Sequence, residues 1–159
     1  MDREEKRAIE NTLMWAHYAD SHKGFCIEYH LDSSDFRRDS KSNLFATRLF
    51  EVAYLPENKN VLDMTDSNTI LNFKTAFFTK SHDWNYENEV RMVSYSPVNS
   101  EKYPPFELGS KSRITAIYFG VNCPEDTINK VKEALLNQDV KYFQMEINPA
   151  QAVMPVHVY

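Results

Sequence analysis

The sequence predicts an α+β fold in which a mostly antiparallel sheet of about six strands packs with about three helices. Three observations lead to this prediction. Strand-like segments follow one another without the regular alternation of helices that a parallel α/β sheet requires. The chain has only three glycines, which excludes the glycine-rich loops of Rossmann and P-loop proteins. Few residues separate the last two strand-like segments, as expected for a hairpin.

Helical spacing of apolar residues predicts a first helix over 3–19, which is expected to end near Gly24 in the turn conformation that glycine favours. The segment "GFCIEYHL", residues 24–31, alternates in the manner of a strand. A second strand is expected for "RLFEVAYL", residues 48–55, which ends before a proline.

The second half of the chain follows the same two periodicities. Helices are expected over 68–81 and over 124–137, the latter with a proline at its start. Residues 103–108 contain two prolines and are expected to form a loop or an edge piece. Strands are expected at 89–96, 113–121, 142–148 and 152–159. In the first of these strands, Val90 and Met92 are expected to face the core. The proline in the last strand favours an edge position.

Length and composition limit the classes of function. The chain has 159 residues, which fits a single domain spanning 1–159. Its formal net charge is −5 without a long basic run, so no nucleic-acid partner is expected. No apolar run approaches the ~20 residues of a membrane-spanning helix, so no membrane partner is expected. The charged start "MDREEKRAIE" and two well-separated cysteines together predict a cytoplasmic protein.

The main candidate site lies in "HDWNYENEVRM", residues 82–92. If residues 87–94 form a strand, Glu87, Glu89 and Arg91 share one face. Arg91 would then keep Glu89 ionised, whereas Glu87 would have only a like charge beside it and a raised pKa if buried. Such a pair suits acid–base catalysis or the binding of sugar hydroxyls. The alternative is a charged, solvent-exposed strand with weak ion pairs.

A second candidate lies at the end of the first predicted helix, in "LMWAHYAD". Trp15, His17 and Tyr18 are close together there, and His17 and Tyr18 follow Met14 at helical spacing. An imidazole beside aromatic rings can line a ligand pocket. The alternative is a buried helix end in which His17 bonds a carbonyl group.

Two further kinds of chemistry are not expected. The histidines and acidic residues do not have the spacing of a metal site, so no metal is predicted. Cys26 lies within an apolar strand, where burial raises a thiol pKa and disfavours a nucleophilic thiolate.

Lys80 could contact an anion, or could lay its apolar stem along a helix end.

Three segments together resemble the bacterial family called domain of unknown function 2971: "LMWAHYADSHKGFCIEYHL", "FFTKSHDWNYENEVRMV" and "ITAIYFGVN". Family members show a W-x-H-Y helix, a K-G strand entry, a K-S-x-x-W-x-Y-E-x-E-x-R segment and a late I-x-F-G strand. The matching residues are Trp15, His17, Tyr18, Lys23, Gly24, Lys80, Ser81, Trp84, Tyr86, Glu87, Glu89 and Arg91. Family members usually begin with a further segment that carries an F-N-D-P-F type motif. The chain therefore resembles the C-terminal part of the family domain, and we expect an apolar surface that favours a homo-oligomer.

The resemblance implies two alternative functions and identifies no cofactor. In the first, the E-x-E pair is similar to the catalytic segment of ADP-ribosyltransferases, and the partner is a nucleotide-like small molecule such as NAD. Glu89 would be the catalytic carboxylate and Glu87 its helper. The ligand contacts would be Trp15, His17, Tyr18, Lys80, Trp84, Tyr86 and Arg91. In the second, the chain is a non-catalytic structural or interaction module in bacterial defence or stress response. Trp84 then caps the core, and Arg91 bridges the glutamates or a helix end.

Overall fold

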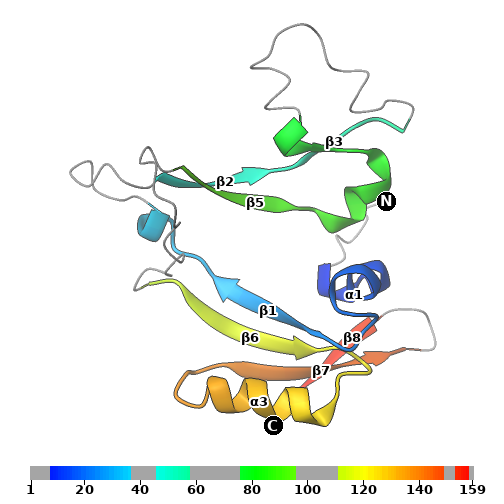
Figure 1. Cartoon of the computed structure of the whole chain (residues 1–159), viewed down its shortest axis with the longest axis vertical. Coiled ribbons are helices and arrows are strands. Elements are labelled where there is room, and N and C mark those ends of the chain that lie inside the picture. Colours follow the sequence, from blue (N-terminus) through cyan, green and yellow to red (C-terminus); the bar gives the residue numbers. More distant parts are fainter. Residues whose placement is uncertain (1–7, 37–45, 58–75, 96–110, 149–152, 158–159) are drawn as a thin grey trace, which may run out of the picture. The chain divides into compact units, whose positions relative to one another are not determined.

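The computed structural model describes residues 8–36, 46–57, 76–95, 111–148 and 153–157 (Figure 1). These residues belong to two compact units. The first unit comprises residues 1–32 and 108–159, and the second comprises residues 33–107. The single domain expected from the sequence stays a prediction.

The first unit is built on a four-stranded sheet with the strand order β1-β6-β7-β8. The strands are β1 (Phe25–His30), β6 (Arg113–Phe119), β7 (Lys141–Ile147) and β8 (Val153–His157). β1 pairs with β6 and β7 with β8 in antiparallel fashion, whereas β6 and β7 are parallel. The parallel pair needs a crossover connection, which α3 (Glu125–Ala134) supplies alongside β7 (Figure 1).

The core of the first unit lies between α1 (Thr12–Tyr18) and one face of this sheet. Its buried side chains are Trp15, Ala19, Ala116, Tyr118 and Met145, with Ile9 of η1 (Ala8–Glu10) packed against them. The indole Nε1 of Trp15 donates a 2.7 Å hydrogen bond to the carbonyl of Ile9, so the buried ring has its polar group satisfied.

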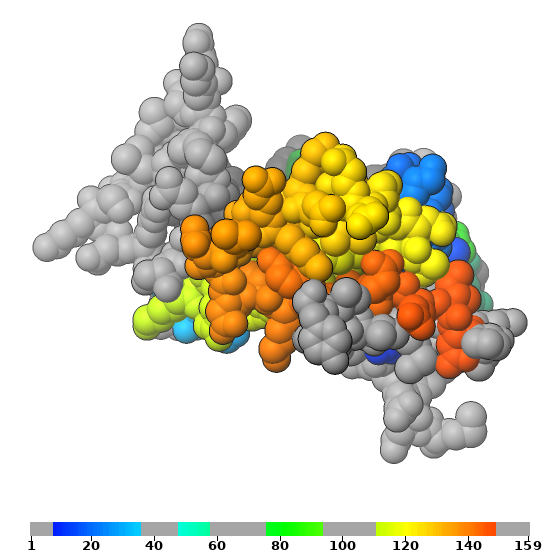
Figure 2. All heavy atoms as spheres, turned by 90° about the horizontal axis from the view of Figure 1, so that it is seen from below, coloured from blue at the N-terminus to red at the C-terminus, as the bar shows by residue number. Residues whose placement is uncertain are grey.

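The opposite face of the sheet is covered by α3. Because side chains alternate along β6, Ile117 and Phe119 point away from the α1 side. Phe119 stacks on Tyr142, and the ammonium of Lys132 in α3 lies 5.5 Å from the centroid of the Tyr142 ring. Figure 2 views this side, where the yellow and orange atoms of α3 and β7 form a continuous surface.

A tight left-handed turn follows α1. Asp20, Ser21 and His22 have φ angles of 45°, 53° and 68°, which non-glycine residues rarely adopt in succession. The carbonyl of His22 approaches Gly120 so closely that a Cβ atom there would lie 2.2 Å from the His22 oxygen. The expectation that Gly24 supplies the left-handed residue was wrong, because these three residues make the turn instead.

The chain leaves and re-enters the first unit at neighbouring points. The backbone N–H of Asp32, at the end of the first segment, donates a 2.9 Å hydrogen bond to Oγ of Ser112. Ser112 is 8% exposed and lies directly before β6. The two segments that build this unit are therefore joined close to where the second unit begins and ends in sequence.

The second unit contains two short sheets. β2 (Ala46–Glu51) pairs with β5 (Val90–Tyr95) in antiparallel fashion, and β3 (Ala53–Tyr54) pairs with β4 (Thr79–Lys80) in parallel. Val52, between β2 and β3, donates its N–H to the carbonyl of Glu89 at 2.9 Å and is buried. Among its described residues the unit also contains two 3₁₀ helices, η2 (Ser33–Phe36) and η4 (His82–Glu87), and a helical turn at 76–78.

The α+β class predicted from the sequence is confirmed, but the single, mostly antiparallel sheet of about six strands was wrong. The strands lie in one mixed four-stranded sheet and two two-stranded sheets, because α3 is long enough to carry the chain across to a parallel neighbour. The hairpin expected at the end is confirmed in its antiparallel pairing, and β8 lies at the sheet edge.

Two other predicted segments lie partly or entirely outside the described residues. The expected helix over 68–81 lies partly outside them, and its last described part gives way to strand β4 at Thr79. The expected loop at 103–108 lies outside them entirely. Among the helices that are described, none has the length and apolar character that crossing a bilayer requires.

Candidate functional site

Four charged side chains of the second unit, Lys80, Glu87, Glu89 and Arg91, form one connected group, here called the charge cluster. The ammonium of Lys80 contacts Oε2 of Glu87 and lies 2.8 Å from Oε2 of Glu89. The guanidinium of Arg91 donates from Nε to Oε1 of Glu89 at 2.6 Å and from Nη2 to Oε2 at 3.2 Å. Glu89 therefore stands between the two cations, and Lys80 stands between the two carboxylates.

The backbone between β4 and β5 brings these groups together. Lys80 is the last residue of β4, and Glu87 is the last residue of η4. Asn88 then adopts a left-handed conformation, with φ 45° and ψ 52°, which asparagine tolerates better than most residues. This single left-handed residue separates the two glutamates, so both carboxylates reach the same ammonium.

The prediction that residues 87–94 form one strand was therefore wrong at its start. β5 begins at Val90, and Glu87 and Glu89 precede it. The predicted environment of Glu87 was also wrong, because its neighbour is the Lys80 ammonium and not a like charge alone. The Glu87 side chain is only 4% exposed, whereas that of Lys80 is 22% exposed.

The predicted effect of Arg91 on Glu89 is confirmed. The hydrogen bonds from Arg91, together with those from Lys80, lower the pKa of Glu89 to about 2, against the smaller opposing effect of burial. Partial burial disfavours the Lys80 ammonium, but its hydrogen bonds to Glu87 and Glu89 outweigh this and raise the Lys80 pKa above its ordinary value. At neutral pH, Glu89 is thus a carboxylate and Lys80 an ammonium.

This shift predicts a pH dependence of stability. The folded-state pKa of Glu89 lies below the ordinary value, so its stabilising effect is complete above pH ~5 and is lost as the pH falls toward ~2. The side chain is 27% exposed, and solvent screening limits the effect to about 1 kcal/mol. We expect the difference in unfolding free energy between the wild type and Glu89→Gln, measured by urea denaturation, to shrink over this range. A difference independent of pH would contradict the assignment.

Two further groups hold the cluster in place. The hydroxyl of Tyr54 accepts a 2.8 Å hydrogen bond from the backbone N–H of Glu89. Nη1 of Arg91 donates to the carbonyl of Phe77, at a helical turn before β4. Sequence reasoning missed both groups. Tyr54 lies 35 positions from Glu89, and a backbone carbonyl leaves no signal in the sequence.

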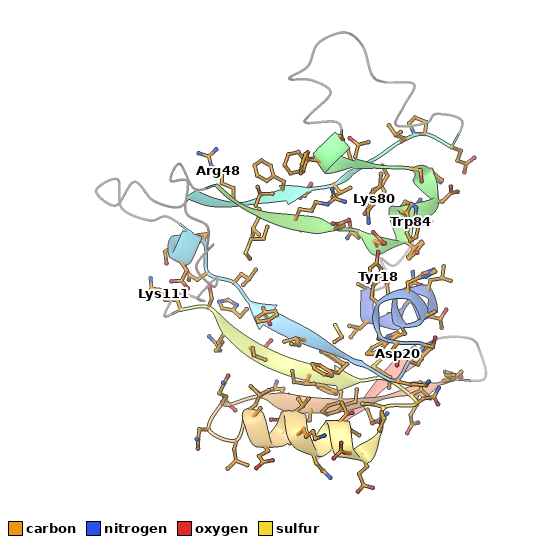
Figure 3. All side chains as sticks on the ribbon, viewed as in Figure 1. Tyr18, Asp20, Arg48, Lys80, Trp84 and Lys111 are labelled. Atoms are coloured by element: carbon orange, nitrogen blue, oxygen red, sulfur yellow. The ribbon has the colours of Figure 1, made fainter. Side chains whose placement is uncertain are left out.

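Two aromatic rings of η4 lie beside the cluster. The ammonium of Lys80 is 5.6 Å from the centroid of the Trp84 ring, a cation–π distance (Figure 3). The rings of Trp84 and Tyr86 have centroids 6.1 Å apart. Trp84 remains 38% exposed, so a large ring borders the charged groups at the surface. The structure thus brings together Lys80, Trp84, Tyr86, Glu87, Glu89 and Arg91 of the predicted site.

The sequence around the charge cluster matches a known protein family. Residues 14–92 match the model of the family described as Protein of unknown function (DUF2971). The chain is a member of the DUF2971 family. No curated protein and no solved structure matches the chain. The DUF2971 match includes every residue of the charge cluster and both aromatic residues of η4.

The DUF2971 match also includes the predicted contacts at the first helix, which belong to the first unit. Trp15 is 2% exposed and stacks on His22, with ring centroids 6.4 Å apart, which gives it a place in the core. His17 and Tyr18 are exposed, and their rings meet edge to face at 6.5 Å. Figure 3 labels Tyr18 at the end of α1. The roles of these three residues as ligand contacts stay predictions.

Metal ligands and thiols are the other reactive groups to consider in this DUF2971 member. Within the described residues, no group of three or more His, Cys, Asp or Glu side chains is arranged to hold a metal ion. Burial, followed by the negative charge of Glu28, raises the pKa of the Cys26 thiol, as expected from its strand. Cys26 is therefore a poor nucleophile at neutral pH.

Proposed function

We propose that the chain is an ADP-ribosyltransferase-like enzyme that binds a nucleotide such as NAD at the charge cluster. The state of Glu89 is the observation that supports this proposal. Its carboxylate is ionised, is held in place from both sides by Arg91 and Lys80, and keeps 27% of its side chain exposed. A fixed, ionised and accessible carboxylate suits a reaction in which positive charge develops on the substrate.

The proposed reaction assigns a role to each group. The glycosidic C–N bond of NAD breaks, nicotinamide leaves with the bonding electrons, and an acceptor nucleophile bonds to the ribose. Glu89 stabilises the oxocarbenium-like charge that develops on the sugar. With a pKa of about 2, Glu89 acts as an anion and not as a proton donor. Glu87 acts as its helper through Lys80, which bonds to both carboxylates.

The remaining contacts complete the proposal. Trp84 and Tyr86 present rings that can hold an aromatic base of the ligand beside the cluster. The ligand contacts that the sequence predicts in the first unit, Trp15, His17 and Tyr18, are a separate proposal and are not assigned to the charge cluster. We also propose a cytoplasmic location and self-association into a homo-oligomer, and light scattering on the purified protein tests the latter.

Titration with NAD, followed by calorimetry and by nicotinamide release, tests the proposed activity. The wild type is expected to bind NAD and release nicotinamide, whereas Glu89→Gln should lower the rate of release at least a hundredfold. Glu57→Gln is the matched control, because Glu57 belongs to the same unit, its side chain is 83% exposed, and its 3.4 Å contact is with His82, outside the charge cluster. A wild-type protein that neither binds nor cleaves NAD, or an unimpaired Glu89→Gln variant, would refute the proposal.

A second candidate is a non-catalytic interaction module in bacterial defence or stress response. The bond from Arg91 to the carbonyl of Phe77 favours it, because it ties β5 to the helical turn before β4 as a structural network would. This reading predicts that Glu89→Gln lowers the unfolding free energy and changes no chemical activity. Because a modest loss of stability is expected from Glu89→Gln in both readings, the nicotinamide assay separates them: only the enzyme reading predicts a folded variant that has lost turnover.

A further inference from the structure

The strand β1 lies at one edge of the four-stranded sheet of the first unit (Figure 1). Antiparallel strands direct the N–H and C=O groups of alternate residues toward each other. The N–H of Gly120 donates a 2.9 Å hydrogen bond to the carbonyl of Gly24, so Gly24 and every second residue after it point their backbone groups at β6. The backbone groups of the residues between them, Phe25, Ile27 and Tyr29, therefore point away from β6, at the edge of the sheet.

The β1 strand is regular along this edge. Its register with β6 shifts after Glu28, but positions 28 and 29 of β1 are opposite 116 and 114 of β6, so the extra residue, Thr115, belongs to β6. A bulge disrupts the strand that carries the extra residue. The alternation of inward and outward backbone groups is therefore kept along β1.

The two edges of this sheet differ in how they are protected. Sheet edges are commonly blunted by proline, by lysine or by a covering segment. β8, at the opposite edge, carries Pro155, which has no N–H to offer. β1 has neither proline nor lysine, and among the described residues no strand pairs with its outer side. The β1 edge is thus able to accept a further strand.

We propose that the first unit binds a second copy of the chain edge to edge, through antiparallel pairing of β1 with β1 of that copy. This inference rests on the self-association proposed above, names its surface, and is independent of the NAD activity. With Ile27 on the two-fold axis, Phe25 of each copy lies opposite the partner's Tyr29. Outward backbone groups then meet outward backbone groups at every one of these positions, and each pair exchanges both of its hydrogen bonds.

The side chains at the same positions make this edge complementary to itself. Phe25, Ile27 and Tyr29 lie on one face of the sheet, because side chains alternate along a strand. The ring of Phe25 meets that of Phe119 at 6.4 Å, yet Phe25 and Tyr29 are still 38% and 44% exposed in the single chain. In the dimer each of these two rings gains the other as its cross-strand neighbour, and aromatic pairs of this kind favour strand pairing.

The charges of β1 are compatible with this register and with few others. Glu28 lies opposite the partner's Cys26, and its carboxylate accepts hydrogen bonds from Thr115 and Tyr118 of its own copy at 2.7 and 2.8 Å. A register shifted by two residues would place Glu28 opposite the partner's Glu28, and like charges directly opposite each other destabilise a strand pair. A second copy therefore fits this edge in one defined register.

Residue-resolved hydrogen exchange of the unmodified protein, at low and at high concentration, tests the pairing without any substitution. Where light scattering finds the dimer, the amides of Phe25, Ile27 and Tyr29 should exchange at least about tenfold more slowly than in dilute solution. The amides of Cys26 and Glu28, which point at β6, should be protected at both concentrations. Equally fast exchange of the outward amides in the dimer would show that another surface joins the copies.

Charge substitutions at the paired positions test the register. Phe25→Lys combined with Tyr29→Lys sets like charges opposite each other and should weaken the dimer at least about tenfold. Phe25→Lys combined with Tyr29→Glu sets opposite charges there and should dimerise at least about tenfold more tightly than the first variant at low salt. Both variants lose the same two rings, so the difference between them reports the pairing. Leu136→Lys alters a 77% exposed apolar residue of the same unit and should leave the dimer unchanged.

The outcomes separate the proposed surface from the self-association on which it rests. A chain that stays monomeric at every concentration overturns both. A dimer whose affinity is the same in the two double variants overturns the β1 surface alone, and the copies then associate through another surface. Outward β1 amides that are already protected in the monomer show an edge covered within the chain, which also overturns the β1 surface.

Discussion

Replacing Lys80 with methionine is expected to lower the unfolding free energy of the second unit by about 2–4 kcal/mol. The Glu87 side chain is 4% exposed, and it forms an ion pair with Lys80, which is 22% exposed. Removing the ammonium takes away a charge that compensates this buried carboxylate, which costs more than the pair itself contributes. Urea titration followed by hydrogen exchange of the β5 amides measures the loss within this unit.

Two comparisons make the Lys80 result specific. Lys130→Met breaks an ion pair with Asp126 whose side chains are 72% and 75% exposed, and it should cost less than about 0.5 kcal/mol. Adding Glu87→Met to Lys80→Met should recover much of the stability, because the buried Glu87 carboxylate is then removed as well. If Lys80→Met and Lys130→Met have equal effects, the ion pair with Glu87 does not have the importance that its burial implies.

Replacing Gly120 with alanine is expected to destabilise the first unit by about 3 kcal/mol or more. The added Cβ would lie 2.2 Å from the carbonyl oxygen and 2.7 Å from the carbonyl carbon of His22. Both are backbone atoms of the left-handed turn, and a hydrogen bond from Asn122 to the His22 carbonyl holds that turn in place. Neither the His22 carbonyl nor residue 120 can move apart to relieve this contact without disrupting the turn or the end of β6.

Gly24→Ala is the matched control for Gly120→Ala. A Cβ at Gly24 would meet backbone atoms of Ala19 at 3.2 Å, which a shift of a few tenths of an ångström relieves. Neither glycine has a positive φ angle, so steric contact alone distinguishes the two variants. Hydrogen exchange of the β7 amides under increasing urea should show a loss for Gly24→Ala of no more than about 1 kcal/mol. Similar losses for both variants would show that the close approach of His22 is not limiting.

Local patterns in the sequence were sufficient to find most elements of the fold. The alternation in "GFCIEYHL" and the apolar run in "RITAIYFGV" correspond to β1 and β6, and the proline before residue 125 marks the start of α3. Strand pairing could not be predicted from local patterns, because it joins residues far apart in sequence. β1, for example, pairs with β6 across more than eighty positions. The parallel pairs β6–β7 and β3–β4 left no local trace.

The candidate site was predicted in part for the same reason. Glu89 and Arg91 are two positions apart, so their pairing could be inferred from strand geometry. The contact of Lys80 with both glutamates could not, because it depends on η4 and on the left-handed Asn88. Val90 and Met92, expected in the core, are 54% and 40% exposed, since the apolar character of a residue does not decide which face of a two-stranded sheet is covered.

The hydrogen bond between Asp32 and Ser112 affects how well the first unit tolerates a change in the length of residues 33–107. It joins the two segments that build the first unit, so residues 33–107 are a long insertion between two segments that are bonded to each other. The free energy needed to close such an excursion grows only by about 0.6 kcal/mol for each doubling of its length. A change in the length of residues 33–107 is therefore expected to alter the stability of the first unit by little.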